Sequence, residues 1–225
     1  RTTGSSFGTA PLLASNEIES QEFYTFGAET RGKKNYNAFG SEDHILSAGV
    51  LYYHVTAPRV DKRATTADAV DGDVRKDTDR NLNDVSLFAE NRFKFGPFSL
   101  TPGVRLENVW QAVKENVNVD KTTVPLADKS DYDFVALFGL GLAYDVSSDL
   151  KIYSNVSQSY RPKIYTQAVP TGSGQVVNND LEEGKSWQAD IGMRGTPAEF
   201  FGWDTSLFYM KFNDQIGTSG TTTDN

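Results

Sequence analysis

Four arginines are the side chains in this sequence best suited to bind an anion. They are Arg59, Arg63, Arg80 and Arg161, and each stands beside or inside a long polar segment. A guanidinium group can hold a carboxylate through two parallel hydrogen bonds, so arginine is a preferred ligand for carboxylate-bearing molecules. The alternative is that each arginine pairs with a nearby acidic residue of the chain, because surface ion pairs are common and weak.

Two other groups of residues could bind a metal ion, and neither has a suitable spacing. Asp71-Gly72-Asp73, followed by Asp77 and Asp79, gathers carboxylates, whose oxygens are the ligands that Ca²⁺ prefers. The spacing departs from that of an EF-hand, so we predict a solvated acidic loop. His44 and His54 lack the spacing of a zinc site, and the chain has no cysteine. The sequence therefore predicts no metal site and no disulfide.

No set of residues is spaced for catalysis. Serine, aspartate and two histidines are present, but no spacing selects a nucleophile with its base. Gly139-Leu140-Gly141 lies inside a predicted strand rather than before a helix, so it is not a phosphate-binding loop. We therefore predict that the chain is not an enzyme.

The composition excludes further classes of protein. The net charge of −8 and the pI of about 4.8 argue against a nucleic-acid surface, which needs clustered lysine and arginine. No apolar run reaches the roughly 18 residues that a membrane-spanning helix requires. The mean hydropathy of −0.48 does not exclude a membrane β-barrel, because a barrel strand presents only every second side chain to lipid.

Alternation of apolar and polar residues is the dominant pattern and predicts β-strands. It is clearest from Tyr132 to Val146, where every second side chain is aromatic or aliphatic and aromatic residues stand at both ends. The opposite face carries smaller or polar residues such as Asp133, Gly139 and Asp145. Aliphatic side chains with aromatic rings at both ends are typical of a strand that crosses a membrane.

The same alternation predicts about eight strands in all. It recurs in three segments whose polar faces carry too many charges for a dry core, namely Val85–Phe95, Phe98–Ala112 and Trp187–Arg194. It is less regular in four further predicted strands, Ile18–Thr30, Ile45–Thr56, Leu150–Arg161 and Trp203–Ile216. In the last of these both faces are partly apolar, so the pattern does not assign its lipid-facing side.

Short and long connections alternate along the chain. The predicted tight turns are Gly96-Pro97, Ser147–Asp149 and Thr196–Gly202, and the predicted long loops are Pro58–Asn83, Asn118–Ser130 and Pro162–Lys185. Long irregular loops are uncommon in a compact domain unless they are functional. An outer-membrane barrel combines short periplasmic turns with long extracellular loops. We therefore predict an all-β fold, an antiparallel transmembrane β-barrel segment, with a soluble β-sandwich as the alternative.

Five runs of residues stand in an order known from one family. They are Ile152–Pro162, Leu181–Gly195, Phe208–Ile216, Ser86–Asn91 and Leu100–Glu107. Together they resemble TonB-dependent outer-membrane siderophore receptors, and most of all the ferric-citrate branch. The resemblance implies a barrel of about 22 strands with a plug domain in its lumen. Residues 1–225 would then be part of a single transmembrane β-barrel domain, with the plug domain and the barrel ends outside this sequence.

The resemblance also implies a function and a location. A receptor of this kind imports a ferric siderophore or ferric citrate across the outer membrane of a Gram-negative bacterium, where it contacts lipid and lipopolysaccharide. Its energy comes from the TonB complex, which would engage a part of the receptor N-terminal to this sequence. The ferric chelate is the transported ligand, and no cofactor is expected. Haem, cobalamin or a glycan is the alternative cargo, and a barrel enzyme such as a protease or lipase is the alternative function.

The connections place the candidate arginines relative to the membrane. Strands that precede long loops ascend to the extracellular rim, so Arg59, Arg63 and Arg161 are expected near the outer mouth, together with Lys163. Ferric chelates of this kind are commonly anionic. These three arginines and Arg80 are therefore the predicted ligand-binding residues, with pairing to protein carboxylates or to lipopolysaccharide phosphates as the alternative.

Overall fold

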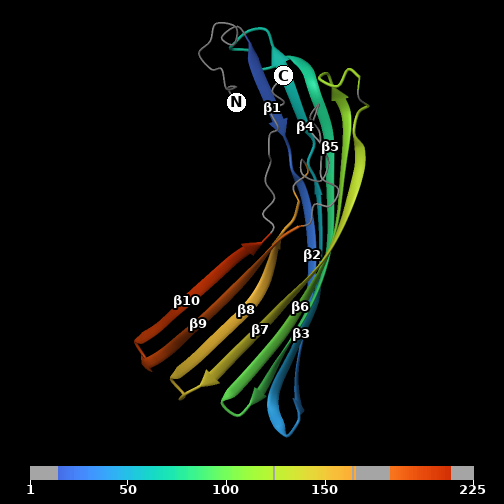
Figure 1. Cartoon of the computed structure of the whole chain (residues 1–225). Helices are drawn as coiled ribbons and strands as arrows, with labels where there is room; N and C mark the ends of the chain where they lie inside the picture. Colours follow the sequence, from blue (N-terminus) through green and yellow to red (C-terminus); the bar gives the residue numbers. More distant parts are fainter. Residues whose placement is uncertain (1–14, 124, 164, 166–182, 214–225) are drawn as a thin grey trace, which may run out of the picture.

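The chain forms one curved antiparallel sheet (Figure 1). The computed structural model describes residues 15–123, 125–163, 165 and 183–213, and these contain ten strands. The strands are β1 (Asn16–Gln21), β2 (Tyr24–Ala38), β3 (Ser41–Thr56), β4 (Arg59–Ala64), β5 (Asp73–Phe95), β6 (Phe98–Asn118), β7 (Asp128–Asp145), β8 (Leu150–Arg161), β9 (Gly184–Ala198) and β10 (Phe201–Asn213). The sheet is open, with β10 at one edge and β1 and β2 at the other, and the predicted all-β antiparallel fold is confirmed. No helix in the described ranges is long and apolar enough to cross a membrane.

The ten strands make eight passes of the chain, the number predicted. β1 and β2 are two halves of one pass, and β3 and β4 are two halves of the next, so β1 pairs with β4 and β2 with β3. β5 pairs with both β3 and β4. The interruption lies at Ala57-Pro58, because proline has no N–H to donate to a neighbouring strand. Glu22 N donates to the Pro58 carbonyl oxygen at 3.2 Å, which keeps the two passes together there.

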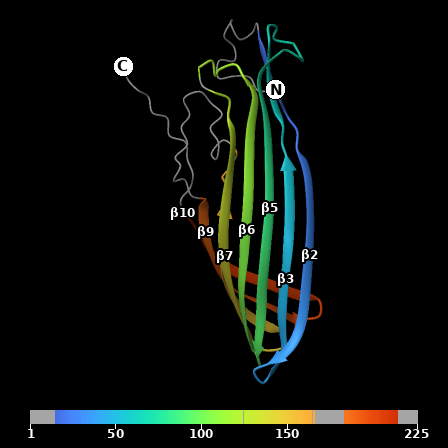
Figure 2. The same cartoon turned by 90° about the vertical axis from the view of Figure 1, so that its right-hand side faces the viewer.

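The register gives the sheet one apolar and one polar face. Residues directly opposite each other in an antiparallel ladder point to the same side of the sheet. One row of such partners consists of Phe93, Leu100, Leu142, Ser154, Ile191 and Leu207. We call the side of this row the apolar face, and the opposite side, which carries Ser86, Glu107 and Asp133, the polar face. Figure 2 shows how the long strands β5, β6 and β7 run side by side through this two-sided wall.

The register also assigns the two sides of β10, which the sequence pattern leaves open. Leu207 and Tyr209 lie opposite Ile191 and Ala189, so they belong to the apolar face. The residues between and beyond them, Phe208, Met210 and Phe212, point to the polar face and are exposed there. This edge strand therefore carries large apolar side chains on both sides.

Exposed aromatic side chains border the apolar face at two levels. Trp110 and Tyr132 pack together at one level, with ring centroids 5.2 Å apart, and Phe98 lies opposite Tyr144 at the other. About 12 residues separate the levels, which at ~3.3 Å per residue and a tilt of roughly 45° corresponds to about 28 Å. A membrane barrel has an apolar band of ~25 Å between its aromatic girdles. The Trp110 level lies on the side of the long connections, where the predicted barrel has its extracellular rim.

The described strands all belong to one sheet, and none of them stacks a second sheet on it. A β-sandwich needs two sheets packed face to face around a dry core. The alternative of a soluble β-sandwich is therefore wrong.

One tight turn escapes the sequence pattern. Phe39-Gly40 joins β2 to β3, and both residues have positive φ, 54° and 70°. Such a two-residue hairpin turn usually carries Asn-Gly or Asp-Gly, so the sequence gives no signal for it. Here the Phe39 ring packs against His44 and Phe93, with centroids 6.2 and 6.4 Å away. His44 is fully buried, with Nε2 2.9 Å from the Ala38 carbonyl oxygen, so it braces the turn rather than binding a metal.

Two predicted connections are more than twice as long as the observed ones. β4 and the first part of β5 lie inside the predicted loop Pro58–Asn83, which leaves only residues 65–72 between them. Glu199-Phe200 alone joins β9 to β10, because the strands extend into the predicted turn Thr196–Gly202. In both places the strands continue beyond the aromatic levels, where water lies on both sides of the wall and the apolar alternation therefore disappears.

Candidate functional site

The polar face above the extracellular aromatic level holds two of the four predicted ligand-binding arginines. Arg59 on β4 lies opposite Thr78 on β5, and Arg80 follows on the same face of β5. Arg59 donates to Asp61 at 2.9 Å and lies 3.2 Å from Glu19. The hydrogen bond to Asp61 raises the pKa of Arg59 although the group is partly buried. Arg59 is thus paired with the protein's own carboxylates.

Arg80 differs, because it is buried with an unused hydrogen-bond donor. It is 8% exposed, and its Nε has no hydrogen-bond partner among the described residues. Its guanidinium carbon lies 5.8 Å from the ring centroid of Tyr165, whose buried hydroxyl also lacks a partner there. Burial and the nearby Arg59 lower the pKa of Arg80, but an arginine stays charged in proteins. A buried cation with a free donor is costly unless an anion supplies the partner.

Arg63 and Arg161 lie apart from this pair. Arg63 stands near the end of β4, opposite Asp73, and lines a hollow of about 330 Å³ together with Arg75. Arg161 is the last residue of β8 and is exposed. The structure therefore brings Arg59 and Arg80 together and leaves the other two arginines at separate places on the wall.

The chain that leaves β8 turns inward and crosses the polar face. Gln111 Nε2 on β6 donates to the carbonyl oxygen of Lys163 at 2.8 Å. Tyr165 then reaches Arg80 on β5, so the chain passes from β8 over β7 and β6 to β5. We call Pro162, Lys163 and Tyr165 the crossing segment. It brings the aromatic ring of Tyr165 to the most buried of the predicted arginines.

The side chain of Lys163 lies among three carboxylates. Its Nζ is 2.8 Å from Asp131 and 2.7 Å from Asp133, both on β7, and 4.0 Å from Glu183, which stands just before β9. The side chain is only 10% exposed. Burial lowers the pKa of Lys163, but the hydrogen bonds to Asp131 and Asp133 outweigh it and leave the pKa above its usual range. Burial, followed by the nearby Asp133, raises the pKa of Glu183.

A further polar network lies below the crossing segment, between the two aromatic levels. Ser86 is fully buried, and its Oγ lies 3.0 Å from Asp84 and within hydrogen-bonding distance of Glu107. Arg105 pairs with the same Glu107. These side chains face the lumen side of β5 and β6, as the charged face of the alternation predicts. They satisfy one another and leave only Asp84 Oδ1 without a partner among the described residues.

The β6–β7 connection is held by a second buried ion pair. Glu115 accepts hydrogen bonds from Lys121 at 2.5 Å, from the Ala127 amide at 2.7 Å and from Asn118 at 2.7 Å. The side chains of Glu115 and Lys121 are 1% and 6% exposed. Burial alone would raise the pKa of Glu115, but the donation from Lys121, Ala127 and Asn118 is stronger and lowers it.

Replacing Glu115 by glutamine is expected to loosen this connection by roughly 3 kcal/mol, because it removes one partner of a buried ion pair. Since the pKa is lowered by folding, the carboxylate contributes fully above the unfolded carboxyl pKa of about 4.3, and the contribution is lost as the pH falls through the folded value. Hydrogen exchange of the Ala127 amide in the full-length receptor, corrected for the intrinsic rate, measures both effects.

The control is Asp120→Asn, which alters an exposed pair with Arg75 and Lys76 and should change the exchange rate little. Unchanged protection of Ala127 in the Glu115→Gln variant would show that the ion pair does not hold the connection.

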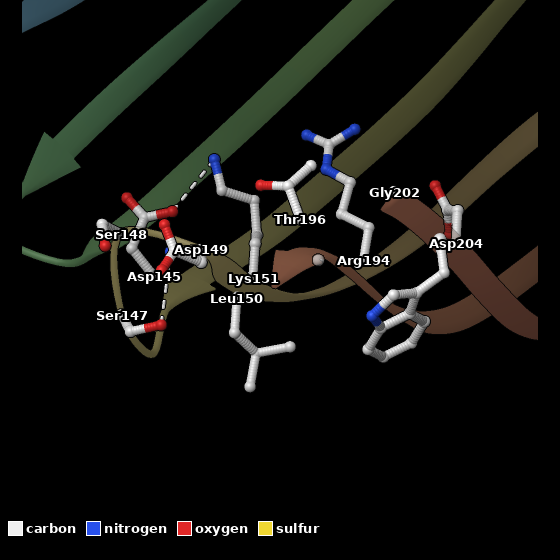
Figure 3. Close-up of a pocket in the computed structure, with 12 residues that line it drawn as sticks. Asp145, Ser147, Ser148, Asp149, Leu150, Lys151, Arg194, Thr196, Gly202 and Asp204 are labelled. Carbon is white, nitrogen blue, oxygen red and sulfur yellow. Dashed lines mark hydrogen bonds and ion pairs between the residues drawn. The ribbon is translucent and has the colours of Figure 1, made fainter. Parts of the chain in front are cut away.

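A hollow of about 770 Å³ lies at the opposite rim, between the β7–β8 and β9–β10 turns (Figure 3). Lys151 bonds to Asp145 at 2.9 Å, and Arg194 lies 5.7 Å from the ring centroid of Tyr153. Trp203 is among the residues that line the hollow. This rim carries the short turns, so a ligand that arrives from the extracellular side would meet the Arg80 region first.

The predicted acidic loop is joined to the sheet by an ion pair. Asp71 pairs with Lys62 at 2.7 Å and accepts the Gly72 amide at 2.9 Å, and the Lys62 hydrogen bond lowers the pKa of Asp71. His54 bonds to Asn83 at 2.9 Å. Within the ranges that the structure describes, no group of three or more histidine and acidic side chains is arranged to hold a metal ion.

Sequence reasoning finds Arg80 and misses the residues that surround it. Tyr165 meets Arg80, and Lys163 meets Asp131 and Asp133 of β7, only because the chain folds inward after β8, which no local pattern signals. The one available sign is that Asp131 and Asp133 share a phase with the polar face of β7. The remainder of the predicted loop Pro162–Lys185 falls largely outside the described residues.

The sequence matches the family described as TonB dependent receptor-like, beta-barrel, over residues 1–225. Among solved structures, that of the ferric citrate transporter FecA in the unliganded form has a TM-score of 0.75 at 17% identity, covering 94% of this chain and 31% of that chain. The structure of the ferric-catecholate import receptor Fiu from E. coli K12 has a TM-score of 0.69 at 14% identity, covering 89% of this chain and 33% of that chain. The structure of the ferric yersiniabactin uptake receptor FyuA from Yersinia pestis has a TM-score of 0.68 at 15% identity, covering 90% of this chain and 30% of that chain. No curated protein sequence matches this chain.

This chain thus spans about a third of the length of the receptors that share its fold. At identities this low, the structural likeness establishes the fold and not the ligand. The family match extends over the whole sequence, and members of the family are transporters rather than enzymes. The apolar face with its two aromatic levels agrees with the predicted place in a lipid bilayer. The chain belongs to the TonB-dependent receptor family and forms a stretch of β-barrel wall in the Gram-negative outer membrane.

Proposed function

We propose that this chain is part of a receptor that imports a ferric siderophore or ferric citrate, and that Arg80 is the main anion ligand of this part of the wall. The observation that carries the proposal is the burial of Arg80 with a free Nε donor, next to the free hydroxyl of Tyr165. Three receptors of the same fold are named for ferric citrate, ferric catecholate and ferric yersiniabactin, which supports an iron chelate as cargo.

The other predicted arginines would act at longer range. Arg59 is already paired, so it adds positive potential beside Arg80 rather than a free donor. Arg161 is exposed and Arg63 lies near the extracellular rim, where they would attract an anion as it enters. Import itself would need a plug domain, which would be another part of the receptor. It would also need the TonB complex, which would engage a part of the receptor N-terminal to this sequence. The apolar face would contact lipid and lipopolysaccharide.

The test is a binding panel with the full-length receptor. Ferric citrate, a ferric catecholate chelate, haem, cobalamin and a neutral oligosaccharide are titrated by calorimetry at low and at moderate salt. We expect an anionic ferric chelate to bind, and to bind more weakly as the salt concentration rises. Tight binding of cobalamin or the oligosaccharide, with no affinity for any ferric chelate, would replace the iron assignment by the alternative cargo.

A further inference from the structure

The ammonium group of Lys163 makes the ion pairs that hold the crossing segment. This group lies within ion-pair distance of Asp131 and Asp133 on β7 and of Glu183 before β9. Lys163 follows β8 and Glu183 precedes β9, so one cation holds both ends of the β8–β9 connection against β7. The Gln111 amide binds the Lys163 carbonyl and adds a second strand, β6, to the same contact.

We propose that Lys163 is a positioning residue, which holds the crossing segment against the polar face and thereby places Tyr165 against Arg80. The inference rests on the proposed function for the role of Arg80, but the position of the segment can be tested without any ligand. Pro162 has no N–H for strand pairing, which favours departure of the chain from β8 at this point.

The burial of the polar face beneath the crossing segment supports the assignment. Gln111, Val113 and Val135 are 2%, 1% and 0% exposed, although only one sheet is present in the described ranges. Val113 lies opposite Arg80 and two positions beyond Gln111 on the same face of β6. It therefore stands between the point where Lys163 is held and the point where Tyr165 meets Arg80.

Removal of the Lys163 cation has a definite consequence. Asp131, Asp133 and Glu183 would be left without their shared counter-charge, and the three neighbouring carboxylates would repel one another. The ends of the connection would then separate from β7, and Tyr165 would no longer be fixed against Arg80. An arginine at position 163 would preserve the charge and should preserve the position in part.

Cysteine labelling measures this position directly in the full-length receptor. Residues 1–225 contain no cysteine, so a Val113→Cys substitution introduces a single thiol into this part of the receptor. We expect maleimide to label this thiol at least ten times faster when Lys163→Met is also present, and Lys163→Arg to restore slow labelling. Two controls are measured in the same way. Ser157→Cys places the thiol at a position of the polar face that is already exposed. Lys151→Met removes a lysine at the opposite rim in place of Lys163.

Affinity for ferric citrate is measured on the same variants. Lys163→Met should weaken binding about tenfold, and Lys163→Arg should recover most of it. If labelling of the cysteine at 113 is as slow in Lys163→Met as in the parent, the positioning role is refuted. If labelling accelerates while a bound chelate keeps its full affinity, Lys163 does not position the ligand site.

Two further outcomes are separated by the design. If the Lys163→Met variant does not reach the membrane, Asp131→Asn replaces it, because this substitution removes a carboxylate partner of Lys163. The cysteine at position 113 is then labelled in the Asp131→Asn variant. If no chelate binds the parent receptor, the proposed function fails, while the labelling rates still decide whether Lys163 holds the segment.

Discussion

Replacing Arg80 by methionine in the full-length receptor is expected to weaken the binding of ferric citrate, or of another anionic ferric chelate that the receptor binds, by about a hundredfold. Arg80 is buried, its Nε is free, and a hydrogen bond from a buried charge to an anionic ligand is worth roughly 2–5 kcal/mol when it is removed. The calorimetric dissociation constant at constant ionic strength is the measurement. Arg80→Lys keeps the charge without the planar fork, so its affinity should fall between the two.

Arg31→Met is the matched control for Arg80→Met. Arg31 is also an arginine, but its side chain is 72% exposed and it pairs with Glu29, two residues earlier on the same face of β2. Loss of such a pair costs at most about 1 kcal/mol, and it should leave ligand affinity within threefold of the parent. Equal affinities for the Arg80 and Arg31 variants would remove Arg80 from the binding site.

A new charge should destabilise the barrel far more at one of two neighbouring residues of β8 than at the other. Val156→Arg places a cation on the apolar face near the middle of the bilayer and is expected to destabilise the folded barrel by about 2–4 kcal/mol. Ser157→Arg places it on the polar face, one residue away, and should cost much less. Val156 lies opposite Leu140 and Ser157 opposite Gly139, so the register separates the two sides without ambiguity.

The measurement is reversible denaturant unfolding of the full-length receptor in lipid vesicles, followed by the tryptophan fluorescence. A Lys substitution at each position, Val156→Lys and Ser157→Lys, controls for the size and shape of arginine. Equal destabilisation at the two positions, or a larger effect at Ser157, would contradict the assignment of the apolar face to lipid.

The faces of the wall could be predicted from the sequence because lipid and water impose different demands on alternate residues. Tyr132–Val146 keeps its phase throughout, and β7 has the predicted sides. Prediction fails where that contrast vanishes. β2 continues to Ala38, well past the predicted end at Thr30, through a stretch with Arg31, Lys33 and Lys34 in which backbone pairing persists without an apolar pattern.

The candidate site was predictable only in its residue types. An arginine above the extracellular aromatic level is an expected anion ligand, and Arg80 meets that description. Its neighbour Tyr165 arrives from a distant part of the chain, next to Lys163 and its ion pairs with the β7 carboxylates. Contacts between segments far apart in sequence carry no periodic signal, so composition and spacing could not reveal them.

The eight passes of the sheet follow one another in sequence order, so each pass pairs only with the passes directly before and after it. Chain closure is cheap when the partners are close in sequence, and its entropic cost grows slowly with loop length. Assembly of this wall can therefore proceed like a zipper, with each completed hairpin offering its free edge as the template for the next. The slowest steps should be the closures across the long extracellular connections, and a barrel arrested during assembly would already have its completed hairpins in final register.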